Sequence, residues 1–354
     1  MKILSVVGAR PQFVKLAPVD KEIRKADEHL IVHTGQHYDP SMSDSFFSIL
    51  DIPVPDYNLS IGSKSHGHQT GEMIASIEDV LLKERPDCVF LYGDTNSTLA
   101  GSIAAAKMHI KTVHIEAGLR SFNRRMPEEL NRVLTDHASD ILLCPSKTAF
   151  HNLEKENLGD RARIVGDVMM QLLHEVTDFI TADVLDELSI TKGEYILMTM
   201  HRQENVDDPV SLGGVMDFIS SIEETVVFPM HPRTRNRIQE FGLWNKVSSI
   251  DNLRLIEPQD FLSFSSLEKN AKVIMTDSGG VQKDAYFFGV PCITLREETE
   301  WLETVEEGWN ILVGTDIEKI HSSFKGVTKP KTSRDSYGGT GVTSRIMELV
   351  REKL

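Results

Sequence analysis

"VIMTDSGGVQKDAYFFGVP", residues 273–291, contains the parts of one β-α unit. Val273–Thr276 is an apolar, β-favouring run, and the polar turn Asp277, Ser278, Gly279 and Gly280 follows it. We expect a helix after the turn, and the free N–H groups at its start would then converge on one anion, such as a pyrophosphate. A plain strand-to-helix turn also needs glycines, so that interpretation stays open for this stretch alone.

The same alternation of apolar β runs and helical patterns extends along the chain. Helical patterns cover residues 11–25, 71–83 and 98–107, among others. Alternation of this kind is typical of parallel sheets built from β-α units, and it predicts an α/β protein with doubly wound sheets. The predicted strands are "ILSVV", "LIVHTG", "CVFLYG", "TVHIE" and "DILLCPS" in the first half, then "YILMTMH", "VVFPMH", "LRLIEP", "KVIMTD" and "PCITLR".

The length of 354 residues predicts two domains of ordinary size. We place the boundary near Asp167, so that residues 1–167 and 168–340 each form a Rossmann-like domain. Residues 341–354 form an amphipathic helix that we expect to return to the first domain. Two such domains in one chain imply a cleft between them.

Composition excludes several classes of protein. The chain has 38 Lys and Arg against 53 Asp and Glu, a net charge of −15, which disfavours a nucleic-acid partner. The three cysteines, Cys88, Cys144 and Cys292, form no C-x-x-C pair, so neither disulfides nor a thiolate metal site is expected. No apolar run approaches the ~20 residues of a membrane span, and the first residues resemble a strand rather than a signal peptide. We therefore expect a soluble, cytoplasmic protein.

The first strand is followed by "GARPQFVK", residues 8–15. Open parallel sheets bind ligands outside the carboxyl ends of their strands, so Arg10 and Lys15 are candidate anion ligands. Neither G-x-G-x-x-G nor the GK[ST] of a P-loop is present, which disfavours nicotinamide, flavin and ATP as cofactors. The plainer interpretation, that Gly8 and Arg10 only shape a turn, stays open here.

Carboxylates and histidines follow other strands. Asp94 and Glu116 come directly after two predicted strands, and Glu128 lies in the next connection, so acid–base chemistry is expected at this rim. Helix capping is the alternative role for Asp94. His201 and His231 each end an apolar strand of the second half, with Arg202 beside the first. No H-E-x-x-H or His/Cys set is present, so we expect no metal.

Six segments together resemble the non-hydrolysing UDP-N-acetylglucosamine 2-epimerases. They are "GARPQFVKLAP", "YGDTNSTLAG", "HIEAGLRSFNRRMPEELNR", "MHRQEN", "FPMHPRTR" and "TDSGGVQKDAYFFGVPCITLREETEW". The resemblance implies a GT-B architecture, a homodimer, and conversion of UDP-GlcNAc to UDP-ManNAc in the cleft without a cofactor. It also assigns catalytic roles to Asp94, Glu116, Glu128 and His201, and nucleotide contacts to Arg10, Ser278, Gly279 and Asp284.

The chemistry agrees with the resemblance. The proton on C2 of a nucleotide sugar is not next to a carbonyl, so simple deprotonation would be far too slow. Expulsion of UDP with loss of that proton gives a glycal, and return of both completes the epimerisation. This route needs acid–base groups near C2 and donors that hold UDP. We count Lys15, Arg202, His231 and Gly280 among the substrate-binding residues.

Two departures from the family pattern bear on substrate and regulation. The ribose-contacting acid is commonly Glu, whereas Asp284 is one methylene shorter. Gln36 and His37 are present but Asp39 occupies the position of a second glutamine, so we expect weak or no activation by substrate. The alternatives left open are a UDP-2,3-diacetamido-glucuronic acid 2-epimerase, a hydrolysing 2-epimerase, a GT-B glycosyltransferase, and a nucleotide-sugar sensor or carrier without turnover.

Overall fold

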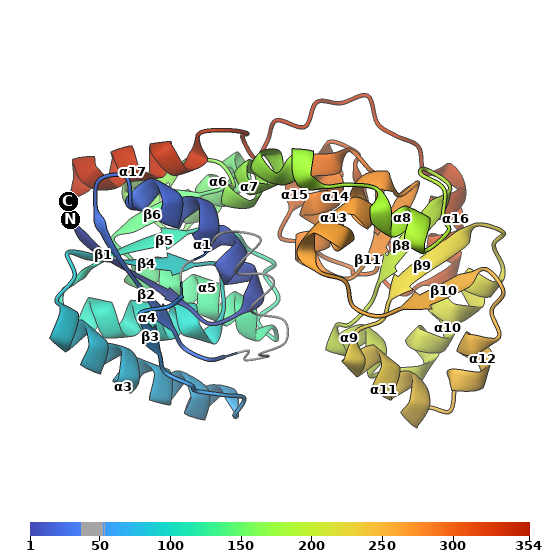
Figure 1. Cartoon of the computed structure of the whole chain (residues 1–354), viewed down its shortest axis with the longest axis horizontal. Helices are drawn as coiled ribbons and strands as arrows, with labels where there is room; N and C mark the ends of the chain where they lie inside the picture. Colours follow the sequence, from blue (N-terminus) through green and yellow to red (C-terminus); the bar gives the residue numbers. More distant parts are fainter. Residues whose placement is uncertain (37–51, 53) are drawn as a thin grey trace. The chain divides into compact units, whose positions relative to one another are not determined.

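The computed structural model describes residues 1–36, 52 and 54–354. These form two compact units, Met1–Glu175 with Asp335–Leu354, and Val176–Arg334. Figure 1 shows the two units, each with its own sheet. The predicted α/β class with two doubly wound parallel sheets is confirmed. The boundary expected near Asp167 and the cleft between domains stay predictions.

The sheet of the first unit has the order β3-β2-β1-β4-β5-β6-β7, and all of its strand pairs are parallel. β1 lies in the interior of the sheet. Along the chain, β2 and β3 are added on one side of β1, and β4 to β7 are then added on the other side. The strands are β1 (Lys2–Val7), β2 (Glu28–His33), β3 (Tyr57–Asn58), β4 (Cys88–Tyr92), β5 (Lys111–Ile115), β6 (Ile141–Cys144) and β7 (Ala162–Ile164).

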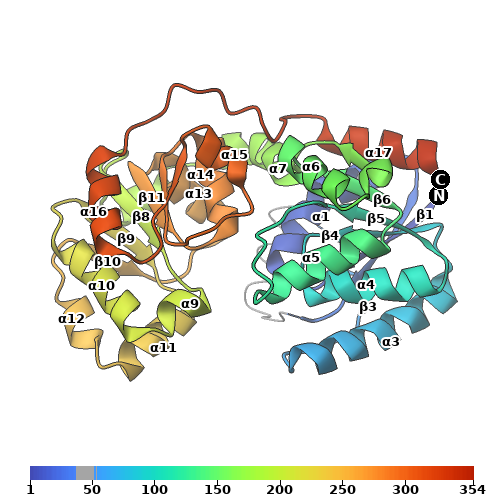
Figure 2. The same cartoon turned by 180° about the vertical axis from the view of Figure 1, so that it is seen from behind.

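Helices cover both faces of this sheet (Figures 1 and 2). One core lies under α3 and α4, where Met73, Ile77 and Ala104 pack against Val6 and Leu91 of the strands. α1 and α17 lie together on the other face. The helices are α1 (Arg10–Ile23), α3 (His66–Glu84), α4 (Asn96–Lys107), α5 (Pro127–Ala138), α6 (Lys147–Lys155), η1 (Gly159–Arg161), α7 (Val168–Val176) and α17 (Val342–Lys353).

The C-terminal helix α17 is held beside the N-terminus of the chain. The Asp27 carboxylate accepts from the Met1 ammonium at 2.7 Å and from Nη2 of Arg351 at 2.6 Å. At the other end of the helix, the Gln171 side chain accepts from the backbone N–H of Thr343 at 3.0 Å. The last helix is therefore part of the first unit.

The second unit repeats the arrangement, with the strand order β10-β9-β8-β11-β12-β13 and parallel pairs throughout. Its strands are β8 (Tyr195–Thr199), β9 (Thr225–Pro229), β10 (Leu253–Ile256), β11 (Val273–Thr276), β12 (Cys292–Thr294) and β13 (Asn310–Leu312). Its helices are η2 (Thr177–Phe179), α8 (Asp183–Glu187), α9 (Gln203–Val206), α10 (Pro209–Ser220), α11 (Pro232–Glu240), α12 (Trp244–Ser248), α13 (Phe261–Asn270), α14 (Gly279–Phe288), α15 (Leu302–Glu306) and α16 (Ile317–Gly326).

All ten strands predicted from apolar runs are confirmed. β3, β7 and β13 were missed, because strands of two or three residues carry too little apolar pattern to be recognised. Cys88, Cys144 and Cys292 are buried free thiols. Within the described part of the chain, no helix has both the length and the apolar character needed to cross a membrane.

Each sheet has one point where its strand order reverses. It lies between β1 and β4 in the first unit and between β8 and β11 in the second. At such a switch point the connections that follow the two strands diverge, and ligands of open α/β sheets bind in the gap. The fold therefore directs attention to the residues after these four strands.

Candidate functional site

The turn after β1 is built around Gly8 and Gln12. The Gln12 side chain accepts from the N–H groups of Gly8 and Ala9 and donates to the Tyr92 carbonyl at the end of β4. A Cβ on Gly8 would lie 2.1 Å from Oγ of Ser97. Gly8 is therefore required by close packing, which supports the plainer interpretation for that residue. Gln12 thus connects the turn after β1 to the end of β4 across the switch point. This role of Gln12 was not predicted from the sequence.

Asp94 follows β4 and does not cap the next helix. The N-cap of α4 is Thr95, whose hydroxyl accepts from the N–H of Thr98. The Asp94 carboxylate is instead ion-paired with Nη2 of Arg132 on α5, and the carbonyl of Asp94 accepts from the Asn131 amide at 3.0 Å. Asp94 is thus a partly exposed carboxylate held against a buried guanidinium.

Glu116 follows β5 on a turn with the unusual backbone angle φ +73°. A positive φ costs energy for a residue with a side chain, so it is retained where the surrounding structure requires it. Oε1 of Glu116 lies 2.7 Å from Nζ of Lys15 on α1. The structure therefore brings Lys15, a predicted anion ligand, to one of the predicted catalytic carboxylates.

The adjacent acids of "MPEELNR" have different surroundings. Glu128 is exposed in the first turn of α5, whereas Glu129 is buried. Glu129 accepts from the N–H groups of Ser121 and Phe122 and from Nη1 of Arg132. It therefore fixes the loop before α5, and Glu128 is the one free to face solvent or substrate.

Asp277, directly after β11, organises the switch point of the second unit. This buried carboxylate accepts from the N–H of His201 at 3.0 Å, the N–H of Arg202 at 2.9 Å and the Asn205 amide at 3.1 Å. It also lies 3.4 Å from Nδ1 of His201. Asp277 thus fixes the turn after β8, a role that its place in the predicted phosphate turn did not indicate.

His201 and His231 lie side by side at the ends of β8 and β9. Their ring centroids are 5.4 Å apart, and Nδ1 of His231 accepts from the N–H of Arg233. Removal of water from the ring, followed by the neighbouring His201 and Arg233, lowers the pKa of His231. An uncharged ring that still carries an Nε2 proton can donate to a phosphate oxygen.

The predicted anion turn begins α14. Ser278 is the N-cap, and its side chain makes no capping hydrogen bond. A Cβ on Gly279 would lie 2.3 Å from Oε1 of Glu300, whereas a Cβ on Gly280 meets nothing closer than 3.9 Å. The first glycine is thus required by packing, and the second leaves open space at a helix start, where phosphate is favoured.

Asp284 lies one turn further along α14. One oxygen of its carboxylate is buried, and Glu268 on the neighbouring helix α13 is a buried acid beside it. Burial, and then the charge of Asp284, raise the pKa of Glu268 well above its usual value. This pair of acids was not predicted, because nothing in the spacing of residues 268 and 284 indicates proximity.

Parts of three predicted positions lie outside the described residues. Arg10 begins α1, but its side chain is outside the described part of the structure, and His37 and Asp39 lie outside the described residues. Gln36 is described, and its side-chain oxygen accepts from the N–H and hydroxyl of Ser97. Among the residues described, no group of three or more His, Cys, Asp or Glu could hold a metal.

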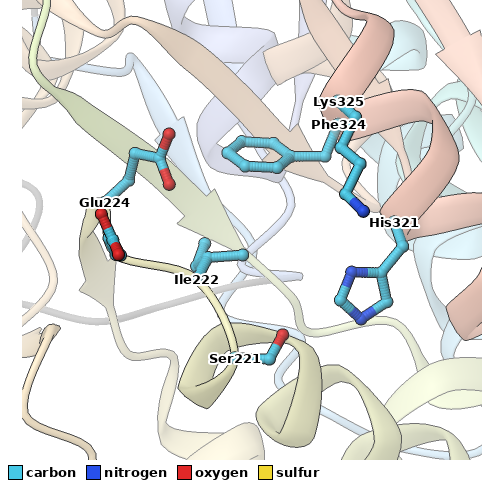
Figure 3. Close-up of a pocket in the computed structure, with 7 residues that line it drawn as sticks. Ser221, Ile222, Glu224, His321, Phe324 and Lys325 are labelled. Atoms are coloured by element: carbon cyan, nitrogen blue, oxygen red, sulfur yellow. The ribbon is translucent and has the colours of Figure 1, made fainter.

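A pocket of the second unit lies at the other end of its sheet. Figure 3 shows Ser221, Ile222 and Glu224 of the segment before β9 facing His321, Phe324 and Lys325 of α16. Because the residues after β8, β9 and β11 occupy the opposite ends of parallel strands, this pocket is separate from the predicted nucleotide residues.

Two doubly wound α/β units in one chain, each with polar side chains at its switch point, define the GT-B class of fold. The sequence model of the family described as UDP-N-acetylglucosamine 2-epimerase matches residues 21–351. The chain belongs to this family.

Individual relatives agree. A UDP-N-acetylglucosamine 2-epimerase homolog from Methanococcus maripaludis is 52% identical, and a UDP-2,3-diacetamido-2,3-dideoxy-D-glucuronate 2-epimerase from Pseudomonas aeruginosa is 47% identical, each over 99% of both chains. The crystal structure of Methanocaldococcus jannaschii UDP-GlcNAc 2-epimerase in complex with UDP-GlcNAc and UDP superposes with a TM-score of 0.92, at 41% identity over 99% of this chain and 100% of that one.

Proposed function

We propose that the protein interconverts UDP-GlcNAc and UDP-ManNAc, without hydrolysis and without a cofactor. The observation that carries this proposal is the pairing of two carboxylates with two cations at one switch point, Asp94 with Arg132 and Glu116 with Lys15. Such pairs hold two carboxylates in fixed positions at the rim of the sheet, and proton transfer at a sugar carbon needs positioned acid–base groups of this kind. The M. jannaschii relative solved with UDP-GlcNAc and UDP supports the choice of substrate.

The proposed reaction is an elimination followed by an addition. A carboxylate removes the C2 proton, the C1–O bond breaks, and UDP leaves with the electron pair, so that a 2-acetamidoglycal forms. A proton is then delivered to C2 from the opposite face while a UDP oxygen attacks C1. No electrons are gained or lost overall, which is why no redox cofactor is needed.

The residues divide between these two tasks. We assign the proton transfers to Asp94, Glu116 and Glu128 together. We assign the binding of UDP to residues of the second unit and to two basic residues of α1. The second-unit group comprises His201, Arg202, His231, Ser278, Gly279, Gly280 and, at the ribose, Asp284, and the α1 residues are Arg10 and Lys15.

Proton NMR of UDP-GlcNAc incubated with the protein in heavy water tests the activity. We expect signals of both epimers to appear, deuterium to enter at C2, and free UDP to stay at trace level. Accumulation of free UDP and free sugar would instead identify a hydrolysing epimerase. A spectrum that does not change would favour a glycosyltransferase or a carrier without turnover.

The Asp94→Asn variant tests the assignment of roles. The amide keeps the shape of the side chain but cannot accept a proton, so binding of UDP should change less than about threefold while C2 exchange falls by at least about 100-fold. Loss of binding with exchange retained would show that Asp94 holds the ligand rather than moves the proton.

A second candidate substrate is UDP-2,3-diacetamido-2,3-dideoxy-glucuronic acid, which the 47% identical P. aeruginosa relative supports. This sugar carries an additional acetamido group at C3 and a carboxylate at C6. Comparing kcat/KM for the two nucleotide sugars under the same conditions decides between them. A preference of about 100-fold or more for either one assigns the substrate.

We further propose that the enzyme is a cytoplasmic homodimer that supplies a sugar for polysaccharide synthesis. The dimer and the setting are supported by the family resemblance. Sedimentation velocity at micromolar concentration tests the dimer, since one species of twice the 39.8 kDa chain mass is expected. A single species at the chain mass would overturn it.

A further inference from the structure

His114 lies on β5, two residues before Glu116, and has no exposed surface. Both of its ring nitrogens have a partner within hydrogen-bond distance. Nδ1 is 2.6 Å from Oδ1 of Asp136 on α5, and Nε2 is 2.7 Å from the carbonyl oxygen of Gly93, the residue before Asp94.

Neither partner can supply a proton. A backbone carbonyl oxygen only accepts, and so does an ionised carboxylate. Asp136 also accepts from the N–H of Gly118 at 3.1 Å and from Nη1 of Arg120 at 2.7 Å. Burial alone would raise the pKa of Asp136, but its partners, the Arg120 guanidinium among them, outweigh burial and hold that pKa below the usual value. Both hydrogen bonds of His114 therefore need protons on the ring.

We infer that His114 is a buried imidazolium, held by Asp136, that positions the Gly93–Asp94 turn for proton transfer. This inference rests on the proposed function as far as catalysis is concerned. The protonation state itself follows from the hydrogen bonds.

Gly93 is held from two sides. Its N–H donates to the Ile115 carbonyl at 3.0 Å, and its C=O accepts from His114. With φ +63°, the turn suits glycine, and a Cβ there would lie 3.2 Å from Nζ of Lys15. The turn that carries Asp94 thus lies against the Lys15–Glu116 ion pair. A shift of about 1 Å in such a turn can lower a rate about 100-fold.

The surroundings of His114 balance its charge. Asp136 faces it from α5, and Arg120 faces Asp136 from the loop after β5. Arg120 is neutralised by Glu156, whose two oxygens each lie 2.8 Å from its guanidinium. The nearby Cys144 thiol on β6 stays protonated, because burial and then Asp136 raise its pKa. Glu156 also has Nε2 of His137 at 3.2 Å from its Oε2.

Two other histidines of the first unit are matched controls. Nδ1 of His29 lies 2.6 Å from Asp20, but its Nε2 lies 2.7 Å from the hydroxyl of Ser5, which can donate as well as accept. Nδ1 of His33 accepts from the N–H of Gly35, so that ring is neutral, and burial lowers its pKa. Of these three described histidines, only His114 has partners that require two ring protons.

Nitrogen-15 NMR of histidine-labelled full-length protein at pH 7 tests the protonation state without any substrate. We expect both nitrogens of His114 to resonate as protonated nitrogens, and Nδ1 of His33 as an unprotonated one. Assignment comes from the loss of signals in single His variants. An unprotonated nitrogen at His114 would overturn the inference whatever the activity.

Kinetics of three variants test the positioning role. His114→Phe should lower kcat about 10- to 100-fold with KM for the nucleotide sugar changed less than about threefold. His114→Gln, which can still donate to Gly93, should be intermediate. His29→Gln removes another buried His–Asp pair from the same unit and should keep kcat within about twofold.

Each outcome bears on the inference. Equal kcat losses in the His114 and His29 variants would reduce His114 to a stabilising residue and overturn the positioning role, as would a change in KM alone. If His114→Phe does not fold, the kcat of His114→Gln is compared with that of His29→Gln, and a larger loss in His114→Gln is then expected. Absence of epimerase activity in the unmodified protein would overturn the proposed function and leave the NMR test of His114 standing.

Discussion

Nζ of Lys15 on α1 lies 2.7 Å from Oε1 of Glu116, and the two side chains are only 11% and 10% exposed. A buried ion pair contributes little net stability, because removing both charges from water costs about as much as their attraction returns. Its retention next to a second acid–cation pair, Asp94 with Arg132, is consistent with a role in catalysis rather than in folding.

Replacing Lys15 by Met should lower both turnover and stability, because removing one partner of a buried ion pair leaves the other charge uncompensated. Glu116 would lose its counter-charge in a poorly hydrated site, and kcat should fall by at least about 10-fold. Lys25→Met is the control, because Lys25 pairs with Glu22 at the same 2.7 Å but is 65% exposed. Exposed pairs are worth about 0–1 kcal/mol, so this variant should behave like the unmodified protein. Equal kcat in both variants would remove Lys15 from the site.

Adjacent glycines at the start of α14 should respond differently to alanine. A Cβ on Gly279 would lie 2.3 Å from Oε1 of the buried Glu300, and we expect Gly279→Ala to lower the free energy of unfolding by about 1–3 kcal/mol. Gly280→Ala meets nothing within 3.9 Å and should raise it by up to about 1 kcal/mol, since alanine favours helix. Chemical denaturation of both variants measures the difference, and equal values would contradict the packing argument.

The sequence predicted the sheets and their rims because apolar strands and the polar residues that end them are local features. Asp94, Glu116, His201 and Ser278 each lie within two residues of a strand end, and parallel strands bring such positions to one edge of each sheet. Without register or side-chain direction, however, the sequence could not show which of these residues make contact.

What the sequence missed depends on contacts between distant positions. His114 and Asp136 are 22 residues apart, and Gln12 reaches Tyr92 across 80 residues. Helix capping was considered for Asp94, but Thr95 is the N-cap of α4. Which of two adjacent residues caps a helix depends on the backbone geometry, and the sequence alone does not show it. The buried polar partners of a site are therefore harder to predict than its exposed rim.

Glu268 should make stability depend on pH. Burial and then Asp284 raise its pKa well above 4.5, and its other titratable neighbours, Tyr195 and Cys292, supply no positive charge. The folded state thus holds this proton more tightly than the unfolded state, so the contribution of Glu268 to stability falls as pH rises above about 4.5.

The Glu268→Gln variant removes this titration. Its melting temperature should exceed that of the unmodified protein at pH 7, and the gain should shrink as pH falls toward 4.5. The exposed Glu187→Gln, in the same unit, serves as the control and should show no such trend. A gain that stays constant from pH 4.5 to 8 would mean that Glu268 is ionised in the folded state.

His231 should make nucleotide binding depend on pH. Removal of water from the ring, then His201 and Arg233, lower its pKa below 6.5, so His231 is neutral at pH 7. In the unliganded folded protein, protonating His231 costs more free energy than in the unfolded chain. The free energy of unfolding therefore decreases as pH falls through the acidic range. A bound diphosphate compensates the new charge, and the Kd for a nucleotide sugar should therefore decrease between pH 7 and 5.5.

Calorimetric titration of the Asp94→Asn variant, with and without His231→Gln, measures this dependence while turnover is blocked. The second substitution should flatten it, and an unchanged slope would assign the proton to another group.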